Sequence, residues 1–141
     1  MRSNEGRVVR QASGRRATEE RGSATVEAAI VFPVVLFLIF GIIQGALWFH
    51  ARHVALGAAQ EGARVVAAEG GVDGEARAVE FIANLTGGTL IRNVIVRESA
   101  TAQTATVTVN GRAPSLIPGV DGLPVSQTAT APVERFTRPG S

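Results

Sequence analysis

Three kinds of residue are absent or scarce in this chain of 141 residues. There is no cysteine, which excludes a disulfide framework, a thiol nucleophile and a thiolate metal site. There is no lysine either: all 14 basic residues are arginine, and the net charge of +2 is too small to indicate a nucleic-acid partner. The aromatic residues are six phenylalanines and one tryptophan, and most of them fall between Phe32 and Phe49. The remainder of the chain is therefore short of the large side chains that build a core.

Groups that carry out catalysis are also scarce. The two histidines, His50 and His53, have no acidic residue beside them in sequence, so a basic patch is favoured over a metal site. The sequence contains no phosphate-binding loop, no nucleophile elbow and no carboxylate pair in apolar surroundings. We therefore expect no enzyme activity, no metal and no cofactor. The acids of the C-terminal half are expected on the solvated surface; these are Asp73, Glu75, Glu80 and Glu98.

What the chain does contain is one long apolar segment. Residues 28–49 include no charged residue, and Gln44 is the one strongly polar side chain among them. As a helix this segment is about 33 Å long, enough to cross a hydrocarbon core of about 30 Å. A cleaved secretory signal is the alternative, but its apolar region normally has only about 7–15 residues. The segment therefore predicts a single transmembrane helix surrounded by lipid.

The charges on either side of this segment indicate an orientation. Residues 1–22 hold six arginines and three glutamates and almost no bulky residue, which predicts a disordered, basic leader. An excess of arginine beside a membrane span keeps that side in the cytoplasm. We therefore predict a single-pass protein of the plasma (inner) membrane, with its N-terminus in the cytoplasm and its C-terminus outside.

One carboxylate, Glu27, stands at the start of the apolar segment. In that position it interacts favourably with the positive end of the helix dipole. A second interpretation begins from the cost of a carboxylate in lipid, which is tolerated mainly when the group is paired. If the chain were cut after Gly22, Ser23 would carry a free amino group. Glu27 of one subunit could then pair with the amino group of its neighbour.

Small residues at helical spacing indicate surfaces for close packing. Gly41 and Gly45 form a G-x-x-x-G pair, which allows another helix to approach, although chance accounts for such a pair equally well. Alanine recurs at every fourth residue from Ala51 to Ala67 and forms a shallow ridge for a neighbouring helix. We expect one helix over residues 23–70, half of it in the membrane and half forming an outer stalk.

Residues 71–137 predict a small extracytoplasmic portion, followed by a frayed tail at residues 138–141. Asp73 is expected to cap a short helix whose apolar face comprises Ala76, Val79, Phe81, Ile82 and Leu85. Strand patterns follow over residues 89–97, 103–109 and 125–133, and Asn110-Gly111 is expected to open a loop before the third strand. In the second strand Ala105, Val107 and Val109 alternate with threonines. The fold class is therefore α+β: a long N-terminal helix, a short helix and a small antiparallel sheet.

The segment Arg21–Ala68 resembles a known family in three blocks of sequence. These are RGSATVEAAIVFP at the start, FGIIQ in the middle and AAQEGARVVA at the end. The first block is similar to the type IV prepilin cleavage signal, in which a glycine precedes a carboxylate by five residues. The whole segment resembles the TadE-like family of the tight-adherence (Tad/Flp) pilus system. It departs from the family pattern at Ala28, where an aromatic residue is usual, and at Gln44, where an acid is frequent.

The resemblance implies a pilin-like protein. On this basis the chain is expected to be a minor pilin or pseudopilin that acts in assembly of a type IVb (Tad/Flp) pilus. Its expected partners are other pilus subunits, the Tad assembly apparatus and a prepilin peptidase. The peptidase would act between Gly22 and Ser23, Glu27 would pair subunits, and Gly41 and Gly45 would pack helices. The alternative is a permanently anchored envelope adaptor that is neither processed nor assembled into a fibre.

Overall fold

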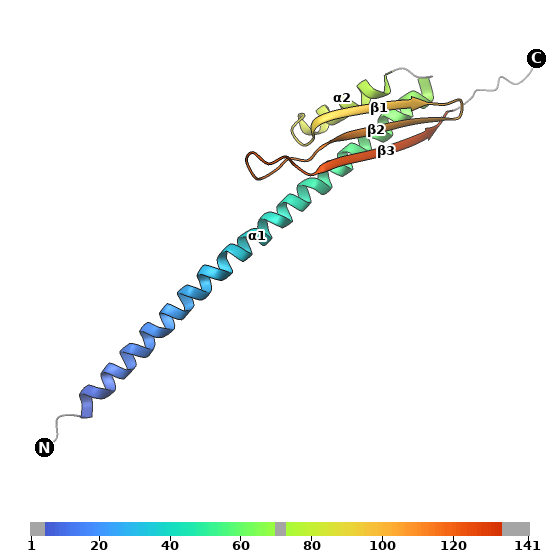
Figure 1. Ribbon diagram of the computed structural model, residues 1–141. Coiled ribbons are helices and arrows are strands. Elements are labelled where there is room, and N and C mark those ends of the chain that lie inside the picture. The colour runs from blue at the N-terminus through green and yellow to red at the C-terminus, as the bar shows by residue number, and fades with distance from the viewer. Residues whose placement is uncertain (1–4, 70–72, 134–141) are drawn as a thin grey trace, which may run out of the picture. The chain divides into compact units, whose positions relative to one another are not determined.

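A computed structural model describes residues 5–69 and 73–133 (Figure 1). The elements are two helices and three strands: α1 (Glu5–Glu69), α2 (Gly74–Thr86), β1 (Arg92–Ala100), β2 (Thr104–Arg112) and β3 (Pro124–Pro132). A long helix, a short helix and a three-stranded antiparallel sheet confirm the predicted α+β fold. The predicted end of the long helix at residue 70 and the predicted tail at residues 138–141 lie outside the described residues.

The chain divides into two compact units, residues 1–42 and residues 43–141. The first unit consists of the N-terminal part of α1. Residues 5–22 are helical, whereas the sequence predicted a disordered leader there. Arginine, glutamate, glutamine and alanine all have good helix propensity, and a helix that already exists extends without a new nucleation step. The long helix therefore starts at Glu5 instead of Ser23.

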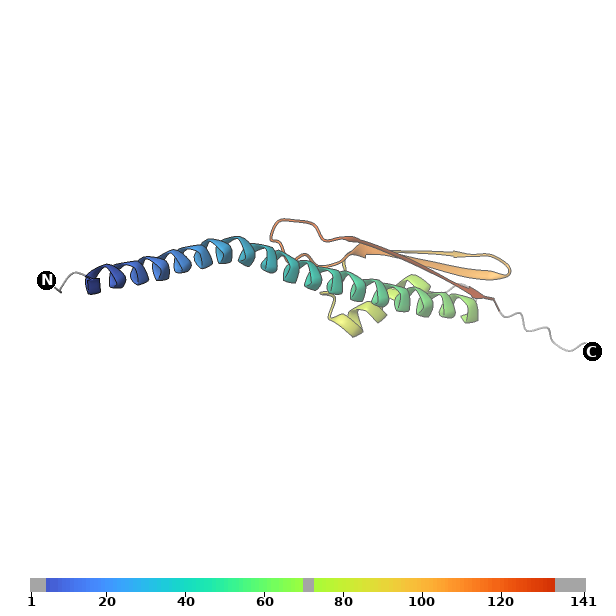
Figure 2. The same cartoon turned by 90° about the horizontal axis from the view of Figure 1, so that it is seen from below.

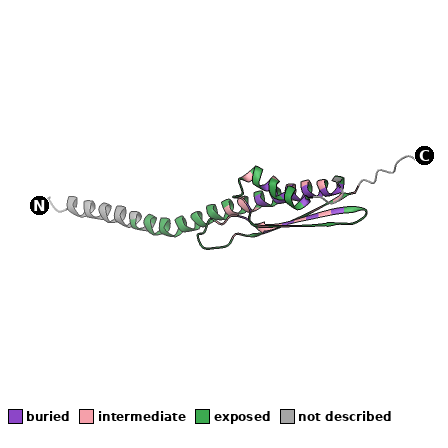
Figure 3. Ribbon diagram, turned by 90° about the horizontal axis from the view of Figure 1, so that it is seen from above, coloured by how far each residue is buried: buried purple, intermediate pink, exposed green. Residues whose placement is uncertain are grey.

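The second unit is built on the C-terminal part of α1. The strands run beside this part of the helix and α2 lies next to it (Figure 2). The ridge of every-fourth alanines from Ala51 to Ala67 is at most 8% exposed and belongs to the same core as Val107 and Val109 of β2. Figure 3 shows this buried face in purple. The ridge is thus covered within the chain itself, and not by the neighbouring helix that the sequence analysis expected.

The sheet has the strand order β1-β2-β3, and both pairings are antiparallel. Along β2 the side chains of Ala105, Val107 and Val109 are fully buried, which confirms the predicted alternation. The opposite face carries threonines that bond across the strands. The hydroxyls of Thr106 and Thr108 lie 3.1 and 2.9 Å from those of their partners on β3, Thr130 and Thr128. Such cross-strand pairs fix the register of the solvated face.

The prediction that Asn110-Gly111 opens a loop is wrong, because β2 continues to Arg112. Gly111 pairs with Val125 in the ladder. A Cβ atom on Gly111 would overlap the Ile91 side chain and stand 3.0 Å from the Arg92 carbonyl oxygen. Glycine therefore serves a close backbone approach inside the sheet, and the loop begins only after the strand.

The predicted apolar face of α2 is wrong in part. Gly74, Ala78 and Ile82 are buried, whereas Val79 and Leu85 are 47% and 61% exposed. Ala76 is also exposed. Asp73 stands at the N-cap position with a positive φ of 59°, but its side chain makes no capping hydrogen bond.

The buried face of α2 differs from the predicted one because the two helices approach each other closely. A Cβ atom on Gly62 of α1 would stand 2.7 Å from the carbonyl oxygen of Gly74, and one on Gly74 would overlap the Val66 side chain. The part of α2 that lies closest to α1 therefore consists of small residues, Gly74 and Ala78. Periodicity correctly selected Phe81 and Ile82, but it also selected Val79 and Leu85, because it favours large apolar residues.

Substitution at this contact gives a test of the packing. We expect Gly62→Leu to lower the free energy of unfolding by about 1–3 kcal/mol, because overpacking forces the helices apart. Gly45→Leu is the matched control, since a Cβ atom there meets no atom within 4 Å and the gain in helix propensity is the same. Thermal unfolding in dilute detergent can be followed by the fluorescence of Trp48, which packs against the core. Equal midpoints for the two variants would contradict the described contact.

Candidate functional site

The predicted processing and pairing residues all lie in the first unit. Gly22 is exposed within α1, and a Cβ atom there would meet no atom within 4 Å. Ser23 is helical, but its side chain lies outside the described residues. Glu27 is exposed, and among the described residues it has no hydrogen-bond or ion-pair partner. The pairing role of Glu27 therefore stays a prediction that concerns another molecule.

The apolar segment that follows is exposed around the whole helix. Every described side chain from residue 24 to residue 43 is exposed, and Phe32 and Phe37 are 68% and 78% exposed. Part of α1 is long and apolar enough to cross a membrane, and this part lies within residues 24–68. A helix that is apolar on all sides and is left uncovered by the described part of its chain fits a lipid environment. The candidate span thus supports a membrane-anchored protein.

The space around Gly41 and Gly45 is open. A Cβ atom on either glycine would meet no atom within 4 Å. Neither glycine is therefore needed for a contact inside the chain, in contrast to Gly62. Their role in packing against another helix remains a prediction.

Gln44, the polar residue of the apolar segment, binds the loop between β2 and β3. Its Nε2 donates a hydrogen bond to the carbonyl oxygen of Pro114 at 2.9 Å. Its Oε1 accepts one from the backbone N–H of Leu116 at 3.0 Å. Both ends of the side-chain amide are therefore used, and both partners are backbone groups more than 60 residues away in sequence. This pair of bonds, the Gln44 clamp, ties the loop to α1.

Trp48, one turn after Gln44, makes a second contact between α1 and this loop. Its Nε1 donates a hydrogen bond to the carbonyl oxygen of Pro124, the first residue of β3, at 3.1 Å. The Arg52 guanidinium lies 4.9 Å from the centre of the indole ring, which is the geometry of a cation–π contact. Gln44 and Trp48 thus hold the two ends of the same loop. Two side-chain N–H donors at positions i and i+4 in an apolar run are the signal from which sequence reasoning could have found this.

The two histidines do not converge on a common point with other metal-binding residues. The His53 ring instead packs edge-on against Phe49, with 4.4 Å between the ring centres. Within residues 22, 24–68 and 73–133, no three residues of the His, Cys, Asp and Glu types lie close enough to hold a metal ion.

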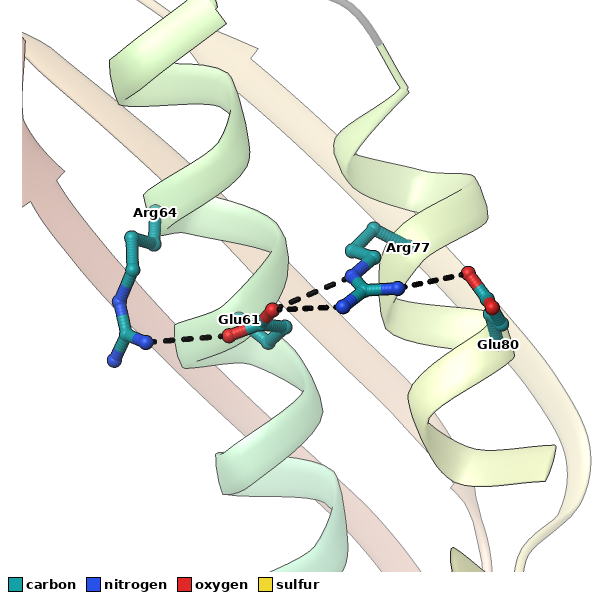
Figure 4. Close-up of polar contacts among 4 residues, drawn as sticks. All are labelled: Glu61, Arg64, Arg77 and Glu80. Carbon is teal, nitrogen blue, oxygen red and sulfur yellow. Dashed lines mark hydrogen bonds and ion pairs between the residues drawn. The ribbon is translucent and has the colours of Figure 1, made fainter. Parts of the chain in front are cut away.

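A polar network joins α1 to α2 (Figure 4). Glu61 accepts hydrogen bonds at 3.3 Å from Arg64 and from both Nε and Nη2 of Arg77, and Arg77 also donates to Glu80 at 3.0 Å. The bonds to Glu80 and Glu61 raise the pKa of the Arg77 guanidinium, so it stays charged. The pair Glu61–Arg64 is local, at positions i and i+3 of one helix, whereas Arg77 comes from another helix and could not be found from sequence spacing. Exposed pairs contribute little to stability, and the network therefore chiefly orients α2 on α1.

Glu75 and Glu98 are exposed, as expected, but they also join α2 to β1. The backbone N–H of Glu75 donates to the Glu98 carboxylate at 3.2 Å, and the backbone N–H of Glu98 donates to the Glu75 carboxylate at 3.3 Å. The Glu98 carboxylate accepts a hydrogen bond from an amide in the first turn of α2, which has no partner within the helix. Glu98 thereby supplies from the sheet the cap that Asp73 does not provide.

Comparison with known proteins gives one match. Residues 22–64 match the family model of the TadE-like protein family, which confirms the resemblance found over Arg21–Ala68. The matched residues run from Gly22 through the apolar segment and the Gln44 clamp to Arg64, and they include neither α2 nor the sheet. No curated protein and no solved structure matches the chain.

Removal of the Gln44 side chain tests the clamp. We expect Gln44→Ala to speed amide hydrogen exchange at Leu116 by roughly fivefold, because a hydrogen bond contributes about 1 kcal/mol net. Gln60→Ala is the control, since Gln60 is an exposed glutamine on the same helix. Exchange measured by NMR in detergent micelles gives the result residue by residue. If Leu116 exchanged equally fast in the wild type and in Gln44→Ala, the clamp would not exist in solution.

Proposed function

We propose that this chain, whose residues 22–64 match the TadE-like family, is a minor pilin or pseudopilin that acts in assembly of a type IVb (Tad/Flp) pilus. Its role is structural, and it carries out no catalysis. The observation that carries the proposal is the position of the match. It covers the prepilin-like signal and the apolar span together, which is the part of a pilin that enters a helical assembly.

The Gln44 clamp supports a definite position in the membrane. The twenty residues from Ala24 to Ile43 form a helix about 30 Å long, which equals the thickness of the hydrocarbon core. Gln44 binds folded chain and therefore lies at the end of the span. With the arginine-rich residues 1–22 in the cytoplasm, the chain from Gln44 onward is on the outer side of the membrane.

In this position Glu27 lies one turn inside the cytoplasmic boundary. A carboxylate at such a depth needs a cation, and the described part of the chain offers none. After a cut between Gly22 and Ser23, the new amino group of a neighbouring subunit supplies that cation. Gly41 and Gly45, where an added Cβ atom would meet no described atom within 4 Å, then allow the helices of two subunits to approach closely.

The partners that follow from this proposal are other Tad pilus subunits, the Tad assembly apparatus and a prepilin peptidase. The apolar span of each subunit remains in contact with lipid until the subunit is incorporated. The folded portion outside the membrane needs no partner for its core, because the alanine ridge of α1 is already buried within the chain.

One observation favours the alternative, an anchored envelope adaptor that keeps its leader. Gly22 lies inside α1, which extends back to Glu5, so a peptidase must first open the helix locally. The mass of the mature protein, measured in cells that contain the pilus peptidase, separates the two functions. A chain that begins at Ser23 supports the pilin, and a chain that retains residues 1–22 supports the adaptor.

Substitution of Glu27 tests the assembly role. We expect Glu27→Ala to insert in the membrane as the wild type does, because the apolar span is unchanged. Its incorporation into sheared pilus fractions should fall several-fold, because the subunit pair loses its charge partner. Glu27→Asp keeps the charge and should restore much of the incorporation. Wild-type incorporation of Glu27→Ala would exclude a pairing role for this carboxylate.

A further inference from the structure

The loop between β2 and β3 exposes an unusual number of bulky apolar side chains. Eight large apolar residues are exposed in the described chain after residue 43, and four of them lie in this loop. These four, the apolar loop tip, are Leu116, Ile117, Val120 and Leu123, and they are 41–62% exposed. The outward face of the sheet carries threonines instead. Apolar surface is therefore concentrated on one loop and not spread over the unit.

The loop is an ordered structure in which backbone groups find partners. The N–H of Ala113 donates to the Leu123 carbonyl oxygen at 2.9 Å and closes the base of the loop. At the tip, the N–H of Val120 donates to the Ile117 carbonyl oxygen at 3.2 Å around Pro118-Gly119, where Gly119 has a φ of 79°. This is the pattern of a type II turn, which requires glycine in that position. Backbone groups that are bonded internally cost less to move out of water.

The loop is also fixed at the end of the membrane span. The Gln44 clamp holds Pro114 and Leu116, and Gln44 directly follows Ile43, the last residue of the uninterrupted apolar run. Trp48 holds the other end of the loop at Pro124. The loop is therefore held next to the residue at which the uninterrupted apolar run ends.

The charges of the loop are compatible with this location. Its one acid, Asp121, lies 4.0 Å from Arg112 at the end of β2. Arg112 also donates a hydrogen bond to the carbonyl oxygen of Gly122 at 3.2 Å. Asp121, which lies between Val120 and Leu123 of the apolar loop tip, is thus paired with Arg112, and the stretch from Leu116 to Val120 carries no charge.

From these observations we propose that the apolar loop tip inserts into the outer leaflet of the membrane, at the boundary between headgroups and acyl chains. The occupant of this surface is lipid, because the surface continues directly from the end of a transmembrane helix. Insertion gives the folded unit a second membrane contact beside α1 and so limits how the unit turns and tilts on its anchor. The proposal rests on the membrane span and not on the pilus role.

The absence of cysteine allows a direct test with single labelled positions. Ile117→Cys, labelled with the environment-sensitive fluorophore NBD, is reconstituted as the full chain in vesicles of phosphatidylcholine and phosphatidylglycerol at high lipid excess. Thr128→Cys, on the exposed face of β3, is the water-facing control, and Val35→Cys is the control inside the span. Circular dichroism of each variant checks that the fold is retained. All three labels are read for emission wavelength, for quenching by iodide, and for quenching by lipids that carry a nitroxide either near the headgroup or deep in the acyl chain.

We expect the label at Ile117 to emit at shorter wavelength than the label at Thr128. Nitroxide lipids should quench it several times more strongly than the Thr128 label, and iodide should quench it less. Emission and iodide quenching equal to those of Thr128 would overturn the proposal. Protection from iodide without quenching by nitroxide lipids would also overturn it, because protein would then cover the loop. Failure of the Val35 label to respond to any lipid quencher would overturn the span and this proposal together, without bearing on the TadE-like match.

Discussion

The side-chain amide of Gln44 marks the point where α1 changes its surroundings. From residue 24 to residue 43, α1 exposes apolar side chains in every direction, and the described part of its unit does not cover them. After Gln44, one face of the same helix is buried against the sheet and α2, and the other face, which carries Arg52, Gln60 and Arg64, is exposed. A glutamine inside an apolar run is costly unless both ends of its amide are bonded, and here the loop after β2 bonds both. The rest of the folded unit is arranged around this fixed point.

Small residues fill much of the core of the folded unit, whereas most protein cores are filled by large ones. The alanine ridge of α1 and the Gly62–Gly74 contact bring backbones close together, so that few bulky side chains are needed to fill the space between them. This explains how a portion so poor in aromatic residues is able to fold. It also separates two kinds of glycine on α1. Gly62 is required inside the chain, whereas Gly41 and Gly45 face open space and are available for contacts with another molecule.

The sequence predicted the elements and the sheet well, because their patterns are local. The alternation Ala105, Val107, Val109 gave the buried face of β2 correctly. The wrong predictions for the buried face of α2 and for the end of β2 had a common cause. In both, a glycine serves a tertiary approach that only the folded chain reveals: Gly74 against α1, and Gly111 against the residues before β1. Local patterns mark Gln44 as a polar group that needs a partner, but they do not identify the distant loop that it binds, and they do not join Arg77 to Glu61. Gly22, Ser23, Glu27, Gly41 and Gly45 were proposed for contacts with other molecules, and a single chain does not test them.

The central claim is that α1 passes from lipid to a one-sided protein core at Gln44. Single cysteines introduced along residues 36–68 of this cysteine-free chain, and probed with a water-soluble maleimide in intact vesicles, test it most directly. The account predicts no reaction up to residue 43, whichever face of the helix is probed. Beyond Gln44 it predicts a helical period, with reaction at Arg52, Gln60 and Arg64 and protection at Ala55, Ala59 and Ala63. A helical period that begins before Gln44, or uniform reactivity after it, would contradict the account.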